Sequence, residues 1–335
     1  MPRVRDRRSL FAVALVIGVA ALARFWLLGG ERVCFDSDEA IVGLMARHIN
    51  QGRSIPTFFY GQAYMGSLDA LLVAGAFRTL GESVMAMRAV QVALALVTLC
   101  LVYRLAGVVT GSRRVALLAL LWLAVPTTLI ALYTTAALGG YNEVLLFGTL
   151  VLLWSWQIAI ERRAEAWRWA ALGLAAGLGW WTHGAIVTAC LVATALGLRT
   201  LSWRPRPWRG YALLLVAFFA GSAPWWVYNL HHDWEAMTFL TSGFRPMPGV
   251  EPVTPLEATA GLWLLGLPAL YGLRVPWEAS PLFAAGTVVA ALAYLALLVE
   301  ALATGLARRK TKAGEERFRY AHRWVWGIFG AFALI

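Results

Sequence analysis

Long apolar segments separated by short polar turns set the strongest limit on what this chain can fold into. A bilayer core requires about 20 apolar residues in one helix, and several segments approach that length. Of the 335 residues, 60% are hydrophobic and only 14% are charged, whereas a soluble domain is about 25% charged. The sequence therefore predicts an all-α polytopic membrane protein. The expected spans lie at roughly 10–28, 84–103, 115–133, 144–160, 169–181, 185–198, 211–230 and 282–304.

Arginine clusters predict the orientation of these spans, because short cytoplasmic loops carry an excess of Lys and Arg. If the apolar run 64–77 does not cross the membrane, the clusters within 3–8, 104–114, 162–168 and 199–209 all lie on the side of the N-terminus. If it crosses, every later cluster moves to the opposite side. The same test indicates that the run 258–273 does not cross. We therefore expect a cytoplasmic N-terminus, and we interpret the net charge of +11 as an orientation signal rather than a nucleic-acid footprint.

This topology leaves two large external regions, a first external loop at 30–83 with juxtamembrane helices and a second region at 231–281. The 12 apolar residues that follow Arg323 are too few to span a bilayer. We therefore expect residues 1–335 to form a single transmembrane domain that is cut short at its C-terminus. Cys34, Cys100 and Cys190 lack a paired spacing and are interpreted as apolar fillers.

Three acidic residues follow the first span within four positions, namely Asp36, Asp38 and Glu39. A helix is expected from Asp38 to about Asn50, and Asp36 with Glu39 fits a capping box at its start. Asp38 would share the apolar face of this helix, so partial desolvation would raise its pKa as a general base requires. Asp-x-Asp also supplies hard oxygen ligands, so a divalent cation such as Mg²⁺ is the alternative.

Other polar residues collect at the external ends of the expected spans. Glu143 opens the fourth span, where an acid either favours the helix dipole or takes part in chemistry. Asp69 lies in an apolar run, where we expect either catalysis or an anchoring pair with Arg78 or Arg88. His183 stands at a span end, as an interface residue or a ligand. The remaining candidates are Tyr60 and Tyr64 at the interface, and His231 and His232 as solvated residues or metal ligands.

Several stretches taken together resemble a known superfamily. They are Asp38-Glu39-Ala40, ARHINQG, IPTFFYGQAYMGSLDALL, GESVMAMRAVQVALALVTLCLVYRLAG, GWWTHGAIV and GSAPWWVYNL. Over roughly residues 1–240 the chain resembles the GT-C superfamily of integral-membrane glycosyltransferases. The most similar branch is that of the lipid A aminoarabinose transferases and the dolichyl-phosphate-mannose protein mannosyltransferases.

The resemblance implies a GT-C-like helix bundle in the bacterial inner membrane. It implies inverting transfer of a sugar from a polyprenyl-phosphate donor to a glycan, lipid or protein acceptor on the extracytoplasmic face. Asp38 matches the catalytic base, and Glu143 matches a second acid, where relatives usually have Asp. Some relatives bind a metal ion and others do not; the candidate ligands here are Asp36, His231 and His232. The candidate substrate-binding residues are Glu39, Tyr60, Tyr64, Arg88, His183 and Arg245.

Two other classes of function stay open at this stage. A lipid-linked sugar flippase or small transporter would require polar groups near the midplane of the bilayer. The expected spans carry few such groups, mainly Gln91 and Gln157, and this favours an enzyme that acts at the membrane surface. A non-catalytic membrane subunit is the third hypothesis, and it predicts that the acidic residues face lipid or bulk water.

Overall fold

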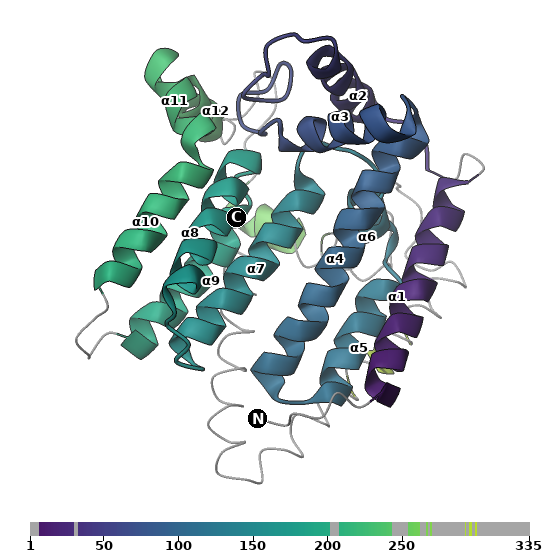
Figure 1. The fold of residues 1–335 in the computed structure, drawn as a ribbon, viewed down its shortest axis with the longest axis vertical. Helices are drawn as coiled ribbons and strands as arrows, with labels where there is room; N and C mark the ends of the chain where they lie inside the picture. The colour runs from purple at the N-terminus through teal and green to yellow at the C-terminus, as the bar shows by residue number, and fades with distance from the viewer. Residues whose placement is uncertain are drawn as a thin grey trace. The chain divides into compact units, whose positions relative to one another are not determined.

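The computed structural model describes residues 7–29, 33–201, 208–242 and 254–261, together with a few single residues beyond them. Within this part of the chain every regular element is a helix, apart from isolated β-bridges (Figure 1). The predicted all-α fold class is therefore confirmed. Arg245, the expected span 282–304 and the last apolar run lie outside the described residues, as does most of the run 258–273.

The chain divides into two compact units. The first unit holds α1 (Arg7–Leu28), the part of α4 (Val84–Thr110) from Ala95 onward, α5 (Arg113–Ala124), α6 (Thr128–Tyr133) and α13 (Pro255–Gly261). The second unit holds α2 (Ser37–Asn50), α3 (Leu68–Leu80), the start of α4, α7 (Tyr141–Ala159), α8 (Ala166–Thr182), α9 (Ile186–Leu201), α10 (Trp208–Gly221), α11 (Ala223–His231) and α12 (Glu235–Ser242).

Three described helices, α1, α4 and α7, are long and apolar enough to cross a membrane. The pair α10 and α11 passes the same test as one broken span, with a bend of 61°. Pro224 stands in the first turn of α11, next to this break, and a proline there disfavours one continuous helix through α10 and α11. The helix α3 has 13 residues and is about 20 Å long, too short for a bilayer core, in agreement with the prediction that 64–77 does not cross.

The expected span 115–133 is wrong as a single helix. It consists of α5, which ends at Ala124, and the six-residue α6, which begins at Thr128. Pro126 lacks an N–H and disfavours a helical conformation at Val125, so the α5 helix stops before it. The Thr127 hydroxyl then accepts a hydrogen bond from the Ile130 N–H and starts α6.

In the first unit, α1 and α5 are joined through a buried arginine. Arg24 is only 1% exposed, and its guanidinium donates to the carbonyls of Leu123 and Ala124, each at 3.2 Å. These carbonyls belong to the last turn of α5, where helical acceptors have no partner within the helix. Arg24 of α1 therefore supplies hydrogen-bond donors for the last carbonyl groups of α5.

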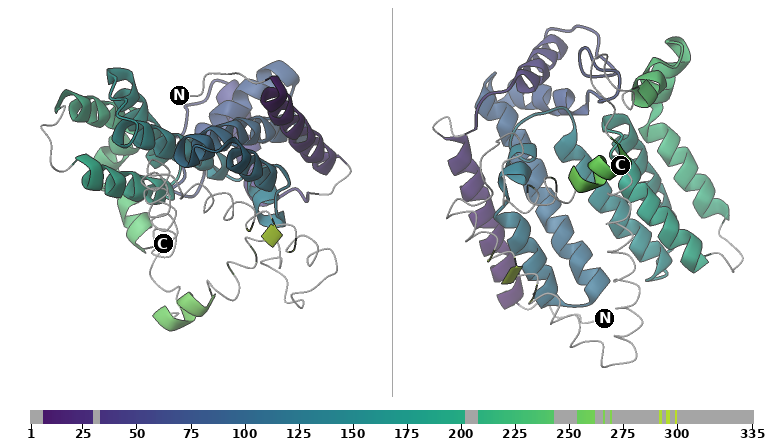
Figure 2. Two further views of the ribbon diagram at one scale, coloured as in Figure 1. Left: turned by 90° about the horizontal axis from the view of Figure 1, so that it is seen from below. Right: turned by 180° about the vertical axis from the view of Figure 1, so that it is seen from behind.

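In the second unit, α8 and α10 pack unusually closely (Figures 1 and 2). Gly173 and Gly177 lie one turn apart on α8, and a Cβ at either would meet the main chain of Leu214 or Phe218 on α10. Small residues at this spacing let two helix backbones approach, which is a common packing device in membranes. The glycines therefore fix where α10 lies against α8.

The helices α2 and α3 pack against each other through an apolar face. Val42 and Met45 of α2 are buried with Val73 and Phe77 of α3 in one cluster. The spacing of the α2 residues follows one side of a helix. This packing fixes the positions of α2 and α3, and with them the polar side chains that the two helices carry.

Candidate functional site

The acidic residues after the first span form the start of α2. The Asp36 carboxylate accepts a hydrogen bond from the Asp38 N–H at 2.8 Å, and the Glu39 carboxylate accepts one from the Asp36 N–H at 3.5 Å. This reciprocal arrangement is the capping box that the sequence predicted. The side chain of Asp36, a predicted metal ligand, is therefore engaged by the helix start.

Asp38 lies in the first turn of α2 with part of its side chain buried. Burial raises the pKa of Asp38, and the negative charge of Asp36 raises it further. The pKa of Tyr64 is raised by burial and also by the charge of Asp38, so the two side chains act on each other electrostatically. The predicted desolvation of Asp38 is confirmed in direction.

Tyr64 belongs to a group of four rings that includes His183. Tyr64 stacks on Phe239 with ring centres 5.1 Å apart and meets His183 edge-on at 5.9 Å. Tyr141, at the start of α7, lies 4.6 Å from His183. Aromatic faces with polar edges are suited to contact with a ring-shaped polar ligand.

The turn between α8 and α9 holds His183 in one orientation. Its Nδ1 accepts a hydrogen bond from the Ala185 N–H at 3.1 Å, so the proton of the neutral ring resides on Nε2. Burial lowers the pKa of His183 to about 4, which keeps the imidazole neutral at physiological pH. Nε2 has no hydrogen-bond partner among the described residues.

Glu39 and Arg88 form a buried ion pair between α2 and α4. The Arg88 guanidinium donates to both Glu39 oxygens, at 2.9 and 2.6 Å, and the two side chains are 5% and 0% exposed. Arg88 also donates to the Cys34 carbonyl, and Glu39 accepts from the Ala137 N–H. The pair therefore ties the acidic start of α2 to α4 and to the segment that precedes α7.

A second buried polar group links α3, α4 and α7. Asp69 accepts from the Gln91 amide at 2.7 Å and from the Gly139 N–H at 3.1 Å, and its carboxyl group contacts that of Glu143. The expected pairing of Asp69 with Arg78 or Arg88 is wrong, because Arg78 bonds to Asn50 and Arg88 bonds to Glu39. An acid within an otherwise apolar run was the sequence signal for this group.

Tyr60 and the histidines near α11 have local partners. The Tyr60 hydroxyl bonds to Nδ1 of His48 at 3.0 Å. The His232 ring stacks on Tyr228 at 3.9 Å, while His231 ends α11. No group of three or more His, Cys, Asp or Glu side chains that could hold a metal ion occurs in the part of the chain that the structure describes.

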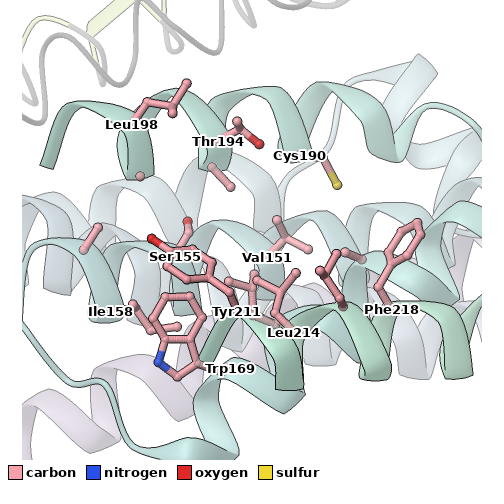
Figure 3. A pocket seen from close by; sticks show the side chains of 16 residues that line it. Val151, Ser155, Ile158, Trp169, Cys190, Thr194, Leu198, Tyr211, Leu214 and Phe218 are labelled. Atoms are coloured by element: carbon pink, nitrogen blue, oxygen red, sulfur yellow. The ribbon is translucent and has the colours of Figure 1, made fainter. Parts of the chain in front are cut away.

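A separate apolar cavity of about 580 Å³ lies among α7, α8, α9 and α10 (Figure 3). The residues that line this cavity include Trp169, Tyr211 and Phe218, and the one nearest to the start of α7 is Val151. Val151 is about 12 Å along the helix axis from Glu143. The cavity is therefore a different feature from the acidic residues at the start of α7.

Comparison with known proteins gives one family match. Residues 68–228, from α3 into α11, match the family described as dolichyl-phosphate-mannose-protein mannosyltransferase. This range includes Asp69, Arg88, Glu143 and His183, while Asp38 and Glu39 precede it. Neither a curated protein nor a solved structure matches the chain significantly. Over residues 68–228 the chain is thus similar to this family, in line with the resemblance to the GT-C superfamily of membrane glycosyltransferases.

Proposed function

We propose that this protein is a membrane glycosyltransferase that uses a polyprenyl-phosphate sugar donor and transfers the sugar, with inversion, to an acceptor on the extracytoplasmic face. The acceptor belongs to the glycans, lipids or proteins of the cell envelope, and the membrane is the bacterial inner membrane. The observation that carries the proposal is the state of Asp38, a partly buried carboxylate with a raised pKa. The family match over residues 68–228 supports the class of reaction.

In the proposed reaction, Asp38 accepts the proton of the acceptor hydroxyl while the hydroxyl oxygen bonds to the anomeric carbon. The bond from that carbon to the lipid phosphate breaks, and the phosphate leaves with the electron pair. A phosphate is a stable anion at neutral pH, so one positioned base is the main requirement. Attack opposite to the departing phosphate gives inversion.

The other predicted residues take supporting roles in this proposal. Tyr64 and His183 are proposed to contact the donor sugar, since their rings adjoin each other and Tyr64 responds to the charge of Asp38. Glu39 and Arg88 are proposed to hold the start of α2 in place, since they bind each other. Glu143 as a second acid, and Tyr60 and Arg245 as donor ligands, remain proposals. A divalent ion at Asp36, His231 or His232 also remains a proposal.

Replacement of Asp38 by Asn tests the assignment. A positioned general base contributes about 10²–10⁴-fold, so Asp38→Asn should lower the rate of sugar loss from a polyprenyl-phosphate sugar by at least about 100-fold. The matched control is Asp233→Asn, an exposed aspartate with φ of 48°, a conformation that Asn tolerates. Full activity of the Asp38 variant, with normal insertion, would overturn the assignment.

A further inference from the structure

Two acidic side chains meet in the interior of the second unit. Asp69 on α3 and Glu143 on α7 are each only 1% exposed, and their carboxyl groups lie close enough to interact directly. Two negative charges so close together and shielded from water would repel each other and would both lack hydration. The contact therefore requires either a proton or a cation between the two groups.

Hydrogen bonds distinguish the two carboxyl groups. Asp69 accepts from both the Gln91 amide and the Gly139 N–H, and such donors stabilise an ionised carboxylate. Gln91 and the main-chain N–H of Glu143 lie near the Glu143 carboxyl group, but among the described residues neither of its oxygens accepts a hydrogen bond of normal geometry. A neutral carboxylic acid has one O–H to donate. Glu143 is therefore the group that fits the proton, and Asp69 is the acceptor.

Among the residues that the structure describes, the charged and titratable groups packed around the pair include no cation that binds either carboxyl group. Arg88 of α4 donates to both oxygens of Glu39 on α2. His183, in the turn after α8, is neutral because burial lowers its pKa to about 4. Three tyrosines also pack against the cluster of buried residues from α2 and α3, and a phenol carries no positive charge in either protonation state; they are Tyr60, Tyr64 and Tyr141. A proton is thus the simplest counter-charge.

We propose that Asp69 and Glu143 share one proton, with Glu143 as the neutral acid that donates to the Asp69 carboxylate. This bond fastens the start of α7 to α3, while the Gly139 N–H binds the other side of Asp69. Asn142, beside Glu143, donates to both the main-chain and side-chain oxygens of Gln91. The shared proton thereby holds the segment 136–140, whose Ala137 N–H binds Glu39 next to Asp38. This role does not depend on the proposed transfer reaction.

The shared proton makes the stability of the fold depend on pH. Burial raises the pKa of Asp69 to about 6, whereas an unfolded carboxyl group titrates near pH 4. The folded chain therefore holds a proton that the unfolded chain releases at neutral pH, so stability decreases as pH increases. The contribution is complete below about pH 4 and is lost as pH rises through about 6 and beyond, until the shared proton leaves.

Thermal unfolding of the full chain in detergent, measured between pH 4.5 and 8, tests the proposal. The wild-type Tm should fall by about 3 °C or more over this range. In Glu143→Gln the amide still donates to Asp69 but carries no titratable proton, so most of this fall should disappear. In Asp69→Asn one amide N–H would face the donor of Gln91 or Gly139, so the Tm should drop by about 5 °C or more at every pH. The control is Glu82→Gln, an exposed acid paired with Arg47, which should keep the wild-type slope.

Two results would overturn the proposal. One is a wild-type pH slope in Glu143→Gln, which would mean that Glu143 carries no shared proton; this readout stands even if the Asp69 variant does not fold. The other is a wild-type Tm that rises with millimolar Ca²⁺ or Mg²⁺ and falls with a chelator, with both effects lost in Glu143→Gln. That result would identify a cation in place of the proton. Neither measurement requires sugar transfer, so failure here leaves the proposed function untouched.

Discussion

Asp38 shares the first turn of α2 with a second carboxylate, and this neighbour affects the pH at which Asp38 loses its proton. The charge of Asp36 adds to burial in raising the pKa of Asp38. Asp36→Asn removes the charge but keeps a good N-cap, so α2 should still begin at the same place. The pKa of Asp38 should decrease, because its ionised form no longer faces a like charge.

The acidic limb of kcat/KM against pH should therefore move to lower pH in Asp36→Asn, since Asp38 must be ionised to accept a proton. The measurement is the pH–rate profile of sugar transfer for the two proteins, with circular dichroism as the control for helix content. An unchanged acidic limb would contradict the proposed role of Asp38 as the base.

The Glu39–Arg88 pair should show strong non-additivity. Removal of one partner leaves an uncompensated buried charge, which costs about 3–5 kcal/mol. Glu39→Met and Arg88→Met should each lower the free energy of unfolding by about this amount, whereas the double variant should lose less than the sum. Unfolding curves of the three variants in detergent measure the coupling. Additive losses would mean that the two charges do not stabilise each other.

Local contacts of single residues could be predicted from the sequence, and distant ones could not. The capping box joins Asp36 and Glu39, which are only three positions apart, so the sequence pattern alone predicts it. The partners of Asp69 are 22 and 70 positions away, and Arg88 is 49 positions from Glu39. No periodicity encodes such pairings, which is why Asp69 was assigned the wrong partner.

At the scale of elements, the close packing of α8 on α10 predicts that a Gly→Ala substitution, which usually stabilises a helix, destabilises this protein. Gly→Ala inside a helix usually stabilises it by up to about 1 kcal/mol. A Cβ at Gly177, however, would lie 2.9 Å from the carbonyl carbon of Phe218, so α10 would have to move away. Gly177→Ala should therefore lower the Tm.

The matched control is Gly197→Ala on α9, where a new Cβ meets no atom within 4 Å. This variant should unfold at the wild-type temperature or slightly above it. The two Tm values, measured side by side in detergent, compare the same chemical change with and without a facing backbone. A Gly177 variant as stable as the Gly197 variant would contradict the close approach of α8 and α10.

Hydropathy predicted most of the helices but not their interruptions. The expected helix from Asp38 to about Asn50 corresponds closely to α2, Ser37–Asn50, because an amphipathic pattern and a cap mark it. The break between α5 and α6 was missed, although Pro126 signals it. Hydropathy does not detect this break, because the residues on both sides of the proline are apolar, whereas the proline interrupts the hydrogen bonds of the helix.

For the molecule as a whole, the arginine pattern predicts a membrane topology, and chemical labelling of Cys34 can test it. Cys34 is exposed and follows the first span, so with a cytoplasmic N-terminus it faces outward. A membrane-impermeant maleimide should label it in right-side-out vesicles and should not label it in inside-out vesicles. Cys34→Ser is the control, because Cys100 and Cys190 lie within α4 and α9. The opposite labelling pattern would reverse the proposed orientation.

The membrane class followed from composition alone, because a low charge content and long apolar segments leave few alternatives. The division of the described helices into two compact units did not follow, since α4 contributes to both. Because the hydropathy of α4 is continuous along its length, the sequence does not indicate at which residue its packing partners pass from one unit to the other.

The buried acids also impose an order on the synthesis of the chain. Glu39 and Asp69 are made before Ala137 and Gly139, whose N–H groups they finally bind. In the interval Glu39 can already bind Arg88 and Asp69 can already bind Gln91, but each still lacks this main-chain donor. These polar contacts of the second unit are thus complete only after the start of α7 has left the ribosome.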